Sequence, residues 1–173
     1  EKTYSGYPVE VTVETVPAGV TVQLTYEGVD GTQYPSSSTP PVNAGKYRVT
    51  AQVEDTFYTG IDSTLLQISK APLICRAEDK FRSYLQENPP LTIRYEGFLA
   101  GDSVSDITAP TAFTNADRLS PVNENGYEIY LQGGSARNYQ LELQSGILMI
   151  NKTQGLFNEV LLSVGVYGMP LKQ

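Results

Sequence analysis

The sequence predicts an all-β protein built from two tandem immunoglobulin-like β-sandwich modules. Apolar and polar residues alternate over short segments, which is the pattern of half-buried strands. The 15 Gly and 11 Pro residues supply turns between these segments, and strands broken by turns every 8 to 12 residues or so are typical of sandwiches. Motifs of the first half also return in the second half in the same order.

The first half contains four expected strands. Strict alternation predicts the first two, with Pro17-Ala18-Gly19 as the turn between them. Residues 28–45 hold Gly, Asp, Ser, Pro and Asn and are expected to form a long loop. The four segments are 9–14, 22–26, 47–53 and 65–68.

The second half begins at Ala71-Pro72-Leu73 and repeats this organisation. Residues 78–85 are expected to form one or two turns of helix, ended by Pro89-Pro90. Its expected strands are 91–95, 127–131, 139–143 and 147–150.

Three repeated motifs set the module boundaries. Tyr26-Glu27-Gly28 recurs as Tyr95-Glu96-Gly97, and Leu66-Gln67-Ile68 recurs as Leu148-Met149-Ile150. The third motif runs from Pro41 to Tyr47 and returns between Pro121 and Tyr127. The expected modules are 1–70 and 71–152, followed by a C-terminal strand or tail over 153–173.

The short linker and the tail carry further expectations. Residues 69–72 include a proline and leave little slack, so the modules are expected to sit end to end. Residues 160–166 are apolar and are expected to add a strand to a sheet edge. The alternative is the truncated start of a following domain.

Composition excludes several function classes. The net charge of −7 is spread over both halves, so no basic patch favours nucleic acid or an anionic membrane surface. No apolar run is long enough to span a bilayer. The chain has no His, which excludes Ser-His-Asp and Cys-His catalysis and His-ligated metal sites. The single cysteine, Cys75, lies in an apolar run and is expected to be a small buried residue.

The remaining candidate sites are weak. Asp102 and Asp106 lie four residues apart and are the candidate calcium ligands, while Glu27 and Asp30 form a second acidic pair. Such pairs can also hydrolyse glycosides when a cleft separates them correctly. Most of the 12 tyrosines lie in strand-like segments and are expected in the core. The tyrosines singled out as possible exposed ligand contacts are Tyr7, Tyr34 and Tyr58.

Taken together, the quoted motifs resemble MBG-type bacterial immunoglobulin-like domains. The first unit adds Tyr4-Ser5-Gly6-Tyr7-Pro8 to the resemblance, and the second adds Asn138-Tyr139 and the run from Gly146 to Ile150. The second unit has Tyr84-Leu85 where its subtype usually has Tyr-Gly. The resemblance covers residues 2–152 and implies a tandem array in a secreted or cell-surface protein, of Bacteroidetes type. Separately, Asp62-Ser63-Thr64 and Asp102-Ser103-Val104 resemble the short O-glycosylation signal of Bacteroidetes surface proteins, which makes Ser63 and Ser103 candidate glycosylation sites.

The expected function is therefore a non-catalytic spacer or interaction module, as in an adhesin-like stalk, without a cofactor. Expected partners are other domains of a parent protein and a glycan or protein ligand. The expected location is extracellular or at the cell surface, with a signal segment removed, since the chain begins without Met. The alternatives are a carbohydrate-binding region of a polysaccharide-processing protein and, least favoured, an enzyme.

Overall fold

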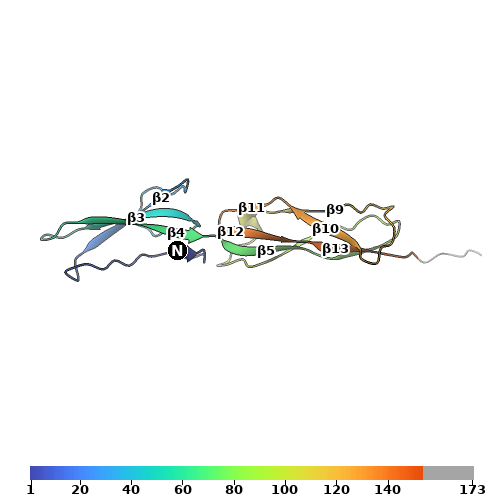
Figure 1. Cartoon of the computed structure of the whole chain (residues 1–173), viewed down its shortest axis with the longest axis horizontal. Helices are drawn as coiled ribbons and strands as arrows, with labels where there is room; N and C mark the ends of the chain where they lie inside the picture. The colour runs from blue at the N-terminus through green and yellow to red at the C-terminus, as the bar shows by residue number, and fades with distance from the viewer. Residues whose placement is uncertain (154–173) are drawn as a thin grey trace, which may run out of the picture.

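The protein is all-β, as the sequence predicts, and consists of several sheets consistent with β-sandwich modules. A computed structural model describes residues 1–153, in which thirteen strands and one short 3-10 turn occur and no α-helix does. The strand expected at 160–166 lies outside the described residues. The two modules lie end to end along the long axis of the molecule (Figure 1).

The first module contains one four-stranded sheet in the order β1-β4-β3-β2. β2, β3 and β4 form an antiparallel meander, whereas β1 pairs in parallel with the end of β4. Inward side chains from these strands, including Tyr26, Tyr47 and Ile68, are almost fully buried. The strands are β1 (Lys2–Thr3), β2 (Val22–Val29), β3 (Gly45–Val53) and β4 (Ile61–Ser69).

The strand expected at 9–14 is wrong. These residues form no ladder, and their one backbone hydrogen bond outside regular strands runs from Val9 N to Pro41 O at 2.9 Å. The alternation is present, since Val9 and Val11 pack against the core. A strand needs a hydrogen-bonding neighbour as well as the pattern, and no neighbour lies beside this segment.

The second module has two main sheets, ordered β6-β13-β10-β9 and β12-β5-β7, and a short β11-β8 pair. The strands expected from alternation are present, with bounds shifted by one or two residues at some ends. The elements are β5 (Ala71–Ala77), β6 (Lys80–Ser83), β7 (Ile93–Glu96), the 3-10 turn η1 (Val104–Asp106), β8 (Ile107–Thr108), β9 (Thr111–Thr114), β10 (Tyr127–Gln132), β11 (Ser135–Ala136), β12 (Tyr139–Gln144) and β13 (Gly146–Asn151).

The helical turn expected at 78–85 is also wrong, because β6 occupies its centre. β6 pairs in parallel with β13, with Phe81 opposite Met149. Arg82 points inward and is 7% exposed, and its Nε donates to Asn88 Oδ1 at 2.7 Å. A helix this short is marginal alone, so pairing with β13 decides the conformation.

One repeated motif occupies different places in the two modules. Tyr26 lies in β2, which pairs with β3, whereas Tyr95 lies in β7, which pairs with β5. Judged by sheet order, the counterpart of β2 is β9. The motif is therefore shared in sequence but does not mark equivalent strands.

The hydrophobic core is continuous across the two modules. One cluster contains Tyr47 and Ile68 of the first module together with Leu73 and Tyr139 of the second. Lys70 alone separates β4 from β5. Cys75 belongs to this cluster and has no exposed surface, which confirms the prediction of a buried thiol.

Candidate functional site: the junction between the modules

A single carboxylate joins the two modules. Asp102 lies in a tight turn closed by its own N–H, which donates to Leu99 O at 2.9 Å. Ala100 and Gly101 in that turn both have positive φ, of 51° and 88°. Two successive residues with positive φ form a tight turn, and the Asp102 side chain next to it meets Tyr4 of the first module.

Two tyrosines from distant parts of the chain donate to the same oxygen. Asp102 Oδ2 accepts from Tyr4 Oη at 2.8 Å and from Tyr139 Oη at 2.7 Å. The Tyr4 and Tyr139 rings meet edge to face, with centroids 5.5 Å apart and an interplanar angle of 80°. Tyr4 follows β1 of the first module and Tyr139 begins β12 of the second, so the carboxylate bridges both.

This environment holds both phenols in their protonated form. Burial, and then the hydrogen bond to Asp102, raise the pKa of Tyr139 to about 12. The same two causes raise the pKa of Tyr4. A phenolate in this largely buried position would place a second negative charge beside the carboxylate and could no longer donate to it, so ionisation of either phenol breaks this arrangement.

An asparagine forms the second contact across the junction. Asn138 Oδ1 accepts from Ala44 N at 3.0 Å, and Asn138 Nδ2 donates to Asn43 Oδ1 at 2.9 Å. Its backbone oxygen accepts from Ala71 N at 2.9 Å. The loop before β3, the start of β5 and the start of β12 therefore meet at this one residue.

Close backbone packing completes the junction. A Cβ placed on Gly6, where φ is +81°, would lie 2.1 Å from the Cβ of Ala100. Lys70 Nζ also donates to Ala136 O at 2.7 Å. Together these contacts can fix the orientation of the two modules. None of the junction residues named above pairs a nucleophile with a base.

The two candidate calcium ligands serve different local roles. Asp106 Oδ2 accepts from Ser103 N at 2.8 Å and caps η1, whereas Asp102 faces the two phenols. Across residues 1–153, His, Cys, Asp and Glu side chains form no group of three or more that could hold a metal ion.

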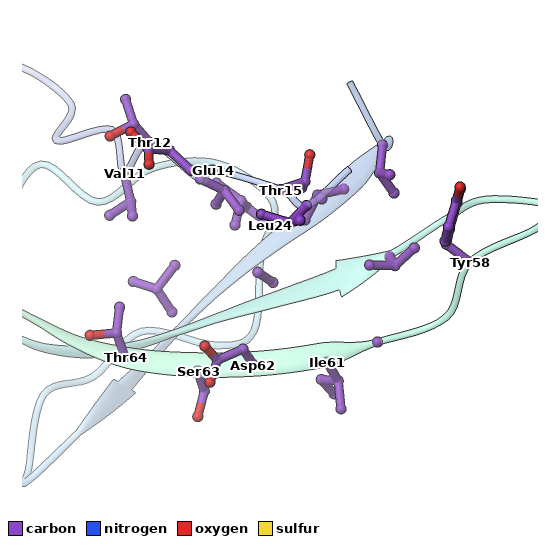
Figure 2. Close-up of a pocket in the computed structure, with 18 of the residues that line it drawn as sticks. Val11, Thr12, Glu14, Thr15, Leu24, Tyr58, Ile61, Asp62, Ser63 and Thr64 are labelled. Atoms are coloured by element: carbon purple, nitrogen blue, oxygen red, sulfur yellow. The ribbon is translucent and has the colours of Figure 1, made fainter. Parts of the chain in front are cut away.

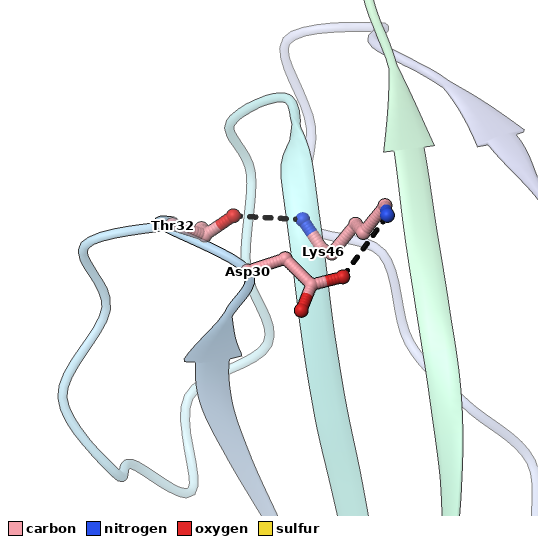
Figure 3. A network of polar contacts seen from close by, with 3 residues as sticks. All are labelled: Asp30, Thr32 and Lys46. Atoms are coloured by element: carbon pink, nitrogen blue, oxygen red, sulfur yellow. Dashed lines mark hydrogen bonds and ion pairs between the residues drawn. The ribbon is translucent and has the colours of Figure 1, made fainter.

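The other acidic pair faces basic side chains. Asp30 Oδ2 lies 3.0 Å from Lys46 Nζ, and Thr32 Oγ1 accepts from Lys46 N at 2.9 Å (Figure 3). Glu27 stands opposite Arg48 in the β2–β3 ladder. Both partners of the Asp30–Lys46 pair are more than half exposed, so this contact adds little stability.

The three candidate ligand tyrosines do not form a common surface. Tyr7 and Tyr58 are 66% and 48% exposed, whereas Tyr34 is half-buried. The Tyr34 ring lies edge to face against Tyr47, and its hydroxyl donates to Thr39 O at 2.7 Å. Within the described chain, no ring of the three pairs with another of them.

The two serines of the candidate glycosylation signals are exposed. Ser63 lies on β4, where its N–H donates to Asp62 Oδ1 at 2.7 Å. Ser103 precedes η1, and its hydroxyl lies 2.8 Å from that of Ser105.

Sequence reasoning missed the junction residues and one aromatic pair. The sequence places Tyr4 and Asn138 only in family motifs and Tyr139 also in an expected strand. It gives none of the three a role at the junction, because contacts across 37 to 98 residues leave no local signal. Phe113 of β9 stacks on Tyr130 of β10 with centroids 5.3 Å apart. Alternation around the buried Ile129 could have placed Tyr130 on the outer face of its sheet.

The structure thus defines two β modules in tandem, joined by an interface of specific hydrogen bonds and close backbone packing. Residues 1–72 match a family model described as MBG domain, and residues 73–149 match one described as MBG domain (YGX type). The chain therefore belongs to the MBG domain family, with two such domains in tandem. No curated protein and no solved structure matches it.

None of the structure over residues 1–153 is a helix with the length and apolar character to cross a bilayer.

Proposed function

We propose that this chain is a non-catalytic spacer of a secreted or cell-surface bacterial protein, which holds neighbouring domains apart at a fixed angle. The observation that carries the proposal is the double hydrogen bond of Tyr4 and Tyr139 to Asp102. A flexible linker needs no such contact. The core that runs through both modules supports the same function.

The spacer function predicts an elongated particle in solution. Small-angle scattering should give a radius of gyration clearly above the 16 Å or so expected of a compact globule of this length. Residual dipolar couplings should fit both modules with one alignment tensor. A compact particle, or separate tensors for the two modules, would contradict the proposal.

The absence of catalysis is part of the proposal. At the junction, the Asp102 carboxylate already accepts a hydrogen bond from within the protein. The chain also has no His to serve as a base. Purified protein should show no turnover on glycan, ester or peptide substrates. Turnover lost with Asp102→Asn or Asp106→Asn would overturn this part of the proposal.

A carbohydrate-binding module is the second candidate, and the Phe113–Tyr130 stack favours it. Phe113 is 40% exposed, and Phe81, on β6 at the opposite edge of the same sheet, is 66% exposed. Exposed aromatic rings can stack against sugar rings. A glycan array run with Phe113→Ala and with Tyr58→Ala as control separates the two functions. Binding lost only with Phe113→Ala would favour the carbohydrate module, and no binding would favour the spacer.

A further inference from the structure

Two arginines lie directly opposite each other on the outer face of the second module. Arg76 of β5 pairs with Arg94 of β7 in the antiparallel ladder, and both side chains are exposed. They point outward because the residues next to them, Cys75 and Tyr95, pack into the core. Like charges placed opposite each other destabilise a sheet. A bound anion would remove this repulsion.

The two arginines differ in their partners. Arg94 Nε lies 3.1 Å from Glu96 Oε1, so a carboxylate on the same strand already neutralises Arg94 in part. Within residues 1–153, Arg76 takes part in no salt bridge. The N–H donors of its guanidinium form a planar fork that fits a carboxylate. This fork therefore has no carboxylate of the described chain to bind.

A pocket of about 360 Å³ opens beside the two arginines. Its volume lies in the range of pockets that hold small molecules, so it has room for an organic ion. Its lining is almost entirely polar or charged, which suits a ligand with several hydrogen-bonding groups. The polar and charged lining residues are Arg76, Glu78, Asp79, Lys80, Arg94 and Ser145.

The acidic residues of the pocket have partners other than the two arginines. Glu78 Oε2 lies 3.3 Å from Lys80 Nζ and accepts from Thr92 Oγ1. Asp79 Oδ1 accepts from Ile147 N at 2.7 Å. A carboxylate can accept several hydrogen bonds, so both acids can still accept from a ligand hydroxyl. The pocket thus offers cationic donors on β5 and β7, and acceptors on the segment between β5 and β6.

The larger groove of the first module has the opposite charge. It has a volume of about 520 Å³ and lies between residues 11–16 and residues 60–64 (Figure 2). Glu14 and Asp62 are its charged lining residues, and no Lys or Arg of the described chain lines it. A carboxylate would be repelled there. Of these two cavities, only the one beside Arg76 suits an anion.

We propose that the pocket beside Arg76 binds a sugar acid, that is, a monosaccharide unit that carries one carboxylate. The carboxylate binds the Arg76 fork and the free nitrogens of Arg94. Glu78 and Asp79 accept hydrogen bonds from the ring hydroxyls. A neutral sugar would leave the arginines unpaired, and a simple anion would leave the acids unused, so a sugar acid uses the whole pocket. The site is independent of the spacer function.

Nuclear magnetic resonance titration of the full chain with glucuronate and galacturonate tests the proposal. Both should shift the amide signals of residues 76–80, 94 and 145, which line the pocket. Glucose lacks the carboxylate and acetate lacks the hydroxyls, so each should bind about tenfold more weakly or less. Arg76→Gln should weaken glucuronate binding by about tenfold or more, because hydrogen bonds from a charged group are lost.

Arg48→Gln is the matched control, because it removes the same charge from an exposed strand position outside the pocket. It should leave glucuronate binding unchanged. Phe113→Ala should also leave it unchanged, because β9 belongs to the other main sheet of the second module. Without ligand, Arg76→Gln should raise the melting temperature slightly, since like charges no longer face each other. Lost binding would then not come from unfolding.

Three results would overturn the proposal. Equal affinity for acetate would show a site for any anion, and equal affinity for glucose would show that the arginines take no part. The absence of any response to the two sugar acids would overturn the proposal directly. Equal weakening by Arg76→Gln and Arg48→Gln would reduce the effect to net charge and overturn it as well.

Discussion

Tyr4 and Asp102, 98 residues apart in sequence, share a hydrogen bond of 2.8 Å that joins the first module to the second. Asp102 therefore has a structural role that its position in an acidic, exposed-looking loop does not suggest. Several measurable consequences depend on this contact.

Replacing Asp102 with Ala should destabilise the protein by about 2 kcal/mol, because two largely buried phenols lose their acceptor. The matched control is Asp106→Ala, which removes the same charge from the same loop but loses only the cap on η1. Thermal unfolding gives both values. Equal losses for the two variants would show that Asp102 acts only through its charge.

Stability should depend on alkaline pH through the two junction tyrosines. The pKa of Tyr139 is about 12 in the folded protein and 10.0 ordinarily, so its contribution is fully present below pH 10. It is lost as the pH rises from 10 toward 12, since the unfolded chain then releases the proton more readily. Tyr139→Phe should reduce this alkaline loss. Melting curves and tyrosinate absorbance test it, and an unchanged alkaline profile in the variant would contradict the assignment.

The contact between Gly6 and Ala100 should make the junction sensitive to one methyl group. Gly6→Ala forces a collision with the Ala100 Cβ in addition to backbone strain at positive φ. Gly19→Ala is the control, because Gly19 has a similar φ of +88° and open space around it. We expect Gly6→Ala to lower the melting temperature more than Gly19→Ala. Ala100→Gly in the same chain should recover the difference, and no recovery would place the strain elsewhere.

Cys75 should react slowly with a thiol reagent in the native protein and quickly in denaturant. The side chain has no exposed surface, and burial raises the pKa of the thiol, so little thiolate forms. Cys75→Ala should be tolerated better than Cys75→Asp, which buries a charge. Fast native labelling would mean that β5 separates from the core.

Calcium should leave the melting temperature nearly unchanged, because Asp102 and Asp106 already accept hydrogen bonds from different partners. Only a ligand that prefers the native state raises stability. Calorimetry with and without calcium tests this, with Asp106→Ala as the second sample. A clear rise that disappears in that variant would establish a site.

The sequence by itself determined the fold class, the tandem of two modules and most of the strands. Those features depend on alternation, turn residues and repetition, which act within a few residues of the chain. It also determined that Cys75 is buried, because its neighbours Leu73 and Ile74 are apolar.

Only the tertiary structure decided which alternating segments find partners. Residues 9–14 have the pattern of a strand but no neighbour, whereas residues 80–83 are a strand because β13 lies beside them. It likewise decided that Asp102 faces Tyr4 and Tyr139 rather than water. Hydrogen bonds between strands and across the junction join residues that are distant in sequence, so no local pattern encodes them.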